Sequence, residues 1–148
     1  MPDKKTLERA EQDKREGKSP GTQAGEFVRE EMDHIREGKH GARSTKQAIA
    51  IGLSKARRAG VKLPPPKQGA ASAETRRRAK SDSASASKSR NPSRTRSRAT
   101  SQALKREGRS AASPTALSRH AKAVARKRTP SQRSAAGRKA AQTRKRTA

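Results

Sequence analysis

A single aromatic residue, Phe27, constrains what this chain can fold into more than any other feature of its sequence. Aromatic side chains bury large apolar areas, so a chain of 148 residues with one of them has little from which to build a core. The net charge of +26, from 39 Lys and Arg against 13 Asp and Glu, opposes compaction further. Low hydrophobicity combined with high net charge is typical of chains that cannot offset the entropy of ordering. We therefore predict that most of the chain is disordered.

Three consecutive prolines at 64–66 divide the chain into parts of different charge. Residues 1–66 hold 15 Lys and Arg against 10 acids, whereas residues 67–148 hold 24 against three. Consecutive prolines favour an extended spacer and exclude a helix. We predict a small all-α head over 25–63, preceded over 1–24 by a marginal charged helix and a linker. The rest, 67–148, is predicted to be a disordered tail rich in Lys, Arg, Ala and Ser, with degenerate repeats from about position 100.

Two helices are expected to form the head. Residues 26–37 place apolar side chains at helical spacing, and Gly38 follows as a stop signal. We predict that this helix pairs with a second one over 45–59 as a helical hairpin, with a third, marginal helix over 4–16. A core this small seldom stands alone, so stabilisation by a homodimer contact or by a bound polyanion is expected. The predicted core residues are Phe27, Val28, Met32, Ile35, Ile49 and Leu53.

The helix over 45–59 has the clearest end signals. Ser44 is a favourable N-cap residue, and Gln47 stands three positions later, as in a capping box. Gly60 fits the left-handed position that follows a helix, with an apolar residue after it. Gly52 lacks a side chain and would let another helix approach closely.

The basic tail is the first candidate binding surface. Lys and Arg side chains that neutralise phosphates release counterions, which gives strong, salt-sensitive binding that is indifferent to base sequence. The tail has no aromatic side chain on which a base could stack, so we expect it to coat duplex rather than bind single strands. Its densest cationic runs are Arg76, Arg77, Arg78, Arg126, Lys127, Arg128, Arg144, Lys145 and Arg146.

The loop between the two head helices is the second candidate surface. It combines glycines, cations and hydroxyls at a helix N-terminus, where backbone N–H groups and the helix dipole attract phosphate. An ordinary capped loop and a solvated helix face fit the same residues, and both interpretations stay open. The candidate contacts are Lys39, His40, Arg43, Ser44, Thr45, Lys46, Gln47, Arg57 and Arg58.

The sequence offers no support for catalysis. Asp33, His34 and Glu37 are the nearest approach to a metal-binding set, but solvated charge explains them better because no H-E-x-x-H motif is present. The many serines lack a convincing His/Asp arrangement. We therefore expect no enzyme, no metal, no cofactor and no small-molecule substrate. No run of about 18 apolar residues is present, so no membrane span is expected.

The string Gly38-Lys39-His40-Gly41, together with the run over 44–60, resembles an uncharacterised family of small basic bacterial proteins. Some members are labelled DNA-binding or plasmid-stabilisation proteins. The composition of the tail is similar to that of bacterial histone-H1-like proteins. This resemblance implies a bacterial, nucleoid-associated role and brings with it no catalytic residue.

The expected function is therefore non-sequence-specific DNA binding, in which a histone-H1-like protein neutralises and condenses duplex DNA through phosphate contacts. The expected location is the cytoplasm, at the nucleoid, or the nucleus if the source is a eukaryote. One alternative is a structural protein associated with RNA or ribosomes. Another is a plasmid-stabilisation or antidote-type regulator that binds a partner protein through the two head helices.

Overall fold

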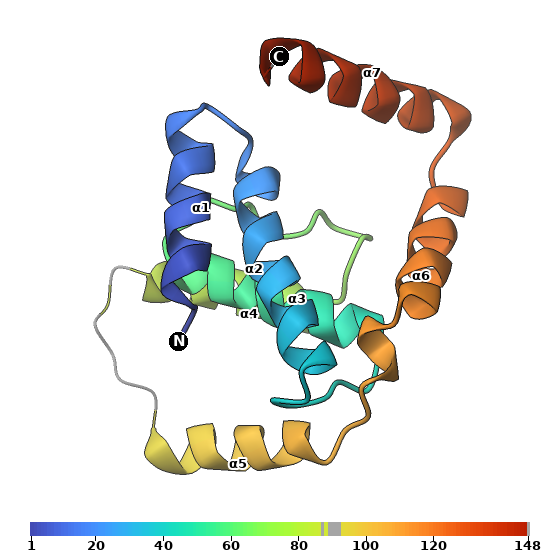
Figure 1. Cartoon of the computed structure of the whole chain (residues 1–148). Coiled ribbons are helices and arrows are strands. Elements are labelled where there is room, and N and C mark those ends of the chain that lie inside the picture. The colour runs from blue at the N-terminus through green and yellow to red at the C-terminus, as the bar shows by residue number, and fades with distance from the viewer. Residues whose placement is uncertain (87, 89–92, 148) are drawn as a thin grey trace. The chain divides into compact units, whose positions relative to one another are not determined.

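The computed structural model describes residues 1–86, 88 and 93–147, and over these residues the chain is predominantly α-helical (Figure 1). The prediction of a mostly disordered chain is therefore wrong, although 87, 89–92 and 148 lie outside the described residues. The helices are α1 (Lys4–Arg15), α2 (Pro20–Arg36), α3 (Thr45–Arg58), α4 (Ala73–Ser85), α5 (Arg94–Lys105), the short 3-10 helix η1 (Ser110–Ala112), α6 (Pro114–Arg126) and α7 (Pro130–Thr147).

Local helix signals explain why the basic part of the chain is ordered. Pro114 and Pro130 open α6 and α7, at the position where the fixed φ of proline suits a helix and its missing N–H leaves no bond unmade. Before α7, the Gln132 N–H donates to Thr129 Oγ1 at 3.2 Å, and the Thr129 N–H donates to Gln132 Oε1 at 3.1 Å. This is a complete capping box. Alanine, the best helix former, separates many of the cations.

The chain forms two compact units, Met1–Ser113 and Pro114–Ala148. In the first unit, α1 and α3 both pack against α2, and α4 packs against α3. The predicted helical hairpin is therefore wrong, because α2 and α3 belong to a larger bundle whose outer helices are charged and bury only small residues. None of the described helices is long and apolar enough to cross a membrane.

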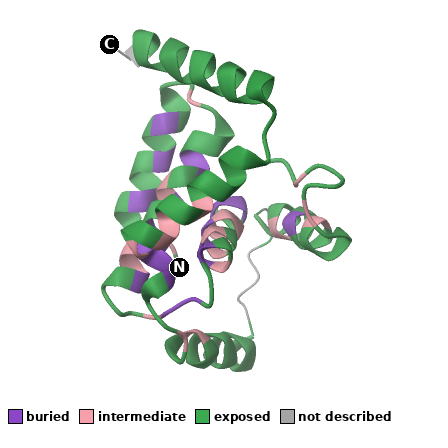
Figure 2. Ribbon diagram, turned by 90° about the vertical axis from the view of Figure 1, so that its right-hand side faces the viewer, coloured by how far each residue is buried: buried purple, intermediate pink, exposed green. Residues whose placement is uncertain are grey.

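The core of the first unit surrounds the ring of Phe27, which is 1% exposed. Figure 2 shows the buried residues in purple, as short stretches on helices that are otherwise largely exposed. Three alanines that the predicted core left out, Ala10, Ala24 and Ala56, bring α1, α2 and α3 close to this ring. Small residues at helix contacts allow one large side chain to fill the space between three helices. Of the predicted core residues, Phe27, Met32 and Ile35 are buried, and Val28, Ile49 and Leu53 are half-buried.

Both ends of α3 are capped as the sequence predicts. Ser44 Oγ accepts the Gln47 N–H at 3.2 Å. Gly60 has a φ of +96°, and the N–H of the following residue, Val61, donates to Ala56 O at 3.1 Å. These bonds form a Schellman end and satisfy carbonyl groups that the helix leaves unpaired. The predicted N-cap and Schellman end are confirmed. The predicted capping box is incomplete, because Gln47 Oε1 accepts the N–H of Arg43 at 2.7 Å, one residue before the N-cap.

Gly52 lies where α3 passes close to the backbone of α2. A Cβ atom at this position would stand 2.7 Å from Val28 Cα, which is too close for any side chain. We expect Gly52→Ala to destabilise the first unit by about 1–3 kcal/mol, because backbone must move to admit the methyl group. Gly25→Ala on α2 is the matched control, since nothing lies within 4 Å of its Cβ position. It should gain up to about 1 kcal/mol of helix propensity.

Urea unfolding followed through the ring-proton signals of Phe27, the only phenylalanine, measures both variants in the first unit alone. Equal midpoints for Gly52→Ala and Gly25→Ala would contradict the close contact.

Candidate nucleic-acid interface

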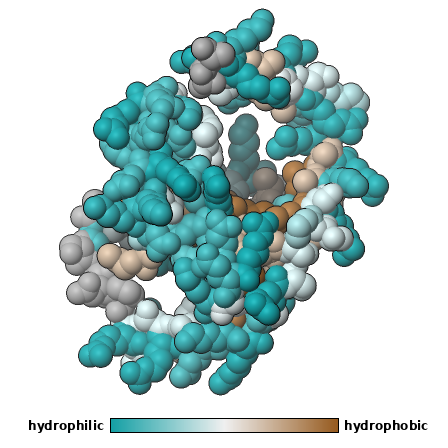
Figure 3. All heavy atoms as spheres, in the orientation of Figure 1, coloured by the Kyte–Doolittle hydropathy of each residue, from teal (hydrophilic) through white to brown (hydrophobic). Residues whose placement is uncertain are grey.

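The second unit carries the densest positive charge in the chain. Between Pro114 and Ala148 there are eleven Lys and Arg residues and no Asp or Glu. All eleven cations are exposed, and hydrophilic side chains dominate the face of the molecule drawn in Figure 3. On α6, Arg119, Lys122 and Arg126 recur at i, i+3 and i+7, which places them on one side of the helix.

The predicted cationic runs lie at different places on the helices. Arg126 ends α6, with exposed Lys127 and Arg128 in the link that follows, and the run 144–146 occupies the last turns of α7. Cations at a helix C-terminus interact favourably with its dipole. The run 76–78 lies on α4, where Arg78 pairs with Glu74 of the same helix. Arg76 is half-buried and Arg77 is exposed.

The loop between α2 and α3 is covered by the chain itself, through residues 104–112. The Gly41 N–H donates to Leu104 O at 2.8 Å, and Thr45 Oγ1 donates to Ala111 O at 2.7 Å. A Cβ at position 41 would overlap the backbone of the covering segment. Donor groups of this loop that we expected to bind phosphate therefore donate to carbonyl oxygens of the protein instead.

The remaining cations of this loop face solvent. Arg43 has a side chain that is 81% exposed, with its Nε 3.6 Å from Glu107 Oε1. Lys39 Nζ lies 2.9 Å from Glu37 Oε2, and this contact raises the pKa of Lys39 above its ordinary value. Lys46 is exposed on the first turn of α3. These side chains can reach an anion, but two of them already have a carboxylate nearby.

The arginines at the end of α3, Arg57 and Arg58, bind other groups of the protein and stabilise the fold. Arg57 is buried and donates from Nη2 to Pro64 O at 3.3 Å, and loss of hydration lowers the pKa of Arg57. Arg58 lies with its Nε 3.4 Å from Asp82 Oδ1 of α4, and its Nη2 donates to Ser54 Oγ at 2.7 Å. This end of α3 is thereby fixed to α4 and to the segment after Gly60.

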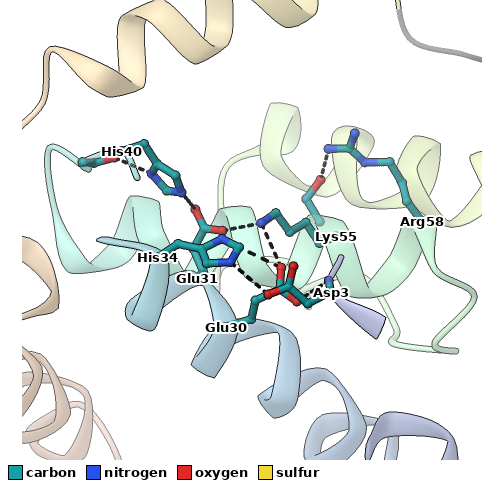
Figure 4. A network of polar contacts seen from close by, with 9 residues as sticks. Asp3, Glu30, Glu31, His34, His40, Lys55 and Arg58 are labelled. Carbon is teal, nitrogen blue, oxygen red and sulfur yellow. Dashed lines mark hydrogen bonds and ion pairs between the residues drawn. The ribbon is translucent and has the colours of Figure 1, made fainter. Parts of the chain in front are cut away.

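A buried polar cluster lies beside the loop, between α2, α3 and the start of the chain (Figure 4). At its centre, Lys55 Nζ of α3 is 2.7 Å from Glu31 Oε2 and 3.4 Å from Glu30 Oε1. The side chains of Glu31 and Glu30 are 0% and 3% exposed. His40 turns inward, so that its Nε2 stands 3.3 Å from Glu31 Oε1 instead of facing solvent.

Asp3 completes the cluster from the segment before α1. Its Oδ2 lies 3.2 Å from His34 Nε2, and its backbone N–H donates to Glu30 Oε2 at 3.1 Å. The hydrogen bond with His34 lowers the pKa of Asp3. The sequence pointed instead to Asp33, His34 and Glu37, of which only His34 belongs here. The available signal was the pair Glu31 and His34 at i and i+3, which shares one helix face.

Residues 15–68 match the model of a family of unknown function, DUF6496. The matched segment includes α2 and α3 and every member of the polar cluster except Asp3. No curated protein and no solved structure matches the chain. Its chemistry must therefore be inferred from its own residues.

Proposed function

We propose that the protein binds duplex DNA without sequence specificity, as a nucleoid-associated, histone-H1-like protein that neutralises and condenses DNA through phosphate contacts. The second unit carries the proposal, with eleven exposed Lys and Arg residues and no Asp or Glu. A helical surface of this charge attracts a polyanion and gains free energy by releasing its counterions. Along each helix these cations recur within a few residues of one another, so that one phosphate backbone could pair with several of them.

The side chains of the protein favour contact with the phosphate backbone of DNA over contact with its bases. Phe27 is the only aromatic residue, and it is buried in the first unit. No aromatic side chain is therefore available for the stacking that single-strand binders use. Arg119, Lys122 and Arg126 present a cationic face of α6 that suits the phosphates flanking a groove. Affinity on this basis is high for duplex and carries little sequence information.

Replacing Arg126, Lys127 and Arg128 together by Gln tests the proposal. If each contacts one phosphate, the slope of log affinity against log salt should become shallower by about 2.7. The matched control replaces Lys4, Lys5 and Lys14 of α1, which changes the net charge equally among neighbouring acids. Its slope should stay close to that of the unaltered protein. Fluorescence anisotropy of a labelled duplex at several salt concentrations measures both.

Three outcomes would contradict the proposal. Equal slopes for both triple variants would show that net charge, and not the second unit, sets the binding. Tighter binding to structured RNA than to duplex DNA at the same salt would favour the RNA-associated function. A stoichiometric complex with a protein that survives high salt would favour the regulator.

A further inference from the structure

We propose that Glu31, His34 and His40 form a binding site for a divalent transition-metal ion, with zinc as the best fit. The site lies in the first unit, whereas the cations of the proposed DNA contact belong to the second unit. The family description names no ligand for these residues. This proposal does not depend on DNA binding, and Zn²⁺ titration tests it separately.

The spacing of the donor atoms suits one metal ion. Each of the three residues offers one donor atom, and these atoms all lie within 4.8 Å of one another. His40 Nε2 and Glu31 Oε1 are 3.3 Å apart. Two ligands held at about 2.0–2.1 Å from a tetrahedral zinc ion are separated by about 3.3 Å. Small adjustments of the His34 side chain would bring its donor to the same ion.

The backbone places these ligands together before any metal arrives. Glu31 and His34 stand at i and i+3 of α2, the Glu-x-x-His arrangement that carries metal ligands in carboxylate-bridged helix bundles. His40 comes from the loop after α2, which the segment 104–112 holds through the Gly41 N–H. Two elements thus converge on a fixed point beside α3.

The second nitrogen of each imidazole ring is occupied in the way that metal-binding histidines require. His40 Nδ1 lies 3.1 Å from Gly41 O, and His34 Nε2 lies 3.2 Å from Asp3 Oδ2. A carbonyl or carboxylate oxygen accepts only, so these nitrogens donate and the other nitrogen of each neutral ring keeps its lone pair. For His40, that lone pair faces Glu31 Oε1, and a cation between the two would satisfy both.

Glu31 supplies the independent observation. Its side chain is fully buried, yet neither carboxylate oxygen makes a hydrogen bond of regular geometry with any described residue. Lys55 Nζ approaches Oε2 at 2.7 Å as an ion pair, which leaves Oε1 directed at His40. A buried carboxylate oxygen without a donor is unfavourable, and metal coordination is one of the few ways to satisfy it.

The charges of the cluster leave room for a divalent ion. Asp3, Glu30 and Glu31 contribute three negative charges, and Lys55 contributes one positive charge. These four charges sum to −2 in a protein of net charge +26, with Asp3 as the exposed member at 59%. One divalent ion on Oε1 of Glu31, with Lys55 retained on Oε2, would balance this sum.

Calorimetric titration of the untagged full chain with Zn²⁺ tests the site, after treatment with a chelator and its removal. We expect one equivalent to bind, and the visible spectrum of the Co²⁺ form to show tetrahedral coordination. His40→Gln should weaken Zn²⁺ binding by about 100-fold or more, because it removes a ligand. Asp3→Asn should weaken it by about 10-fold through the orientation of His34. His120→Gln, at the only histidine outside the cluster, is the matched control and should bind as the unaltered protein does.

The ring-proton signals of Phe27 show whether each variant keeps the fold of the first unit. If His40→Gln unfolds, His34→Gln and Glu31→Gln provide the same test. The proposal is overturned if the unaltered protein binds no stoichiometric Zn²⁺. It is also overturned if folded ligand variants bind as tightly as the unaltered protein, or if His120→Gln abolishes binding.

Discussion

The affinity of the protein for duplex DNA should fall by about 10³–10⁵ between 50 and 200 mM monovalent salt, the range typical of six to ten phosphate contacts. The second unit has eleven exposed cations and no Asp or Glu of its own to compete with phosphate. With ten contacts, the plot of log affinity against log salt should have a slope near −9.

Fluorescence anisotropy with one labelled duplex at four or more salt concentrations measures this slope. A second duplex of equal length and different sequence is the control, and its affinity should agree within a few-fold at each salt concentration. A nearly flat salt titration, or a large difference between the duplexes, would contradict binding through phosphates. A flat titration would not bear on the proposed metal site, because Glu31, His34 and His40 belong to the first unit and that proposal uses none of these cations.

Sequence signals that act over a few residues predicted their structures well. Ser44 and Gly60 marked the ends of α3, and each makes the expected cap, whereas the Gln47 side chain accepts the N–H of Arg43, one residue before the N-cap. Gly52 indicated a close helix contact, which it makes with α2. Caps and glycines act through neighbouring backbone atoms, so their effect can be derived without knowing the rest of the fold.

Composition misled the prediction for the rest of the chain. One aromatic side chain indicated too small a core, but Ala10, Ala24 and Ala56 let three helices surround Phe27. In the basic part, the pairs Ser113-Pro114 and Thr129-Pro130 mark the starts of helices that bury little. Their stability rests on caps and alanine content, which average hydrophobicity and net charge do not measure.

The candidate site residues show a second limit of prediction from sequence, which is the direction in which a loop side chain points. Lys46 and His40 look alike in sequence as potentially cationic residues flanking one helix N-terminus, yet Lys46 faces solvent and His40 faces Glu31. The difference arises because residues 104–112 cover the loop and fix its path. A contact between segments more than 60 residues apart leaves no local signal in either of them.

Lys55→Met should destabilise the first unit by about 3 kcal/mol when a chelator keeps the protein free of metal. The ammonium group lies 2.7 Å from Glu31 Oε2 and 3.4 Å from Glu30 Oε1, and both carboxylates are buried. Removing one partner of a buried ion pair leaves an uncompensated charge, which typically costs about 3–5 kcal/mol. We expect the lower end of that range because the Lys55 side chain is 22% exposed.

Urea unfolding read from the Phe27 ring signals reports this change, and Lys46→Met on the exposed side of α3 is the matched control. The control should shift the free energy of unfolding by less than about 0.5 kcal/mol. Equal losses for the two lysine variants would show that the cluster does not depend on the ion pair.

The double variant Lys55→Met, Glu31→Leu separates pairing from packing. Replacing both members of a buried ion pair by apolar groups is often neutral or stabilising, so the double variant should recover much of the loss of Lys55→Met. A loss equal to the sum of the two single variants would show that Lys55 and Glu31 act independently. Recovery would show that Lys55 mainly offsets the buried charge of Glu31. Glu31 would then be the carboxylate of the cluster that a second cation stabilises most.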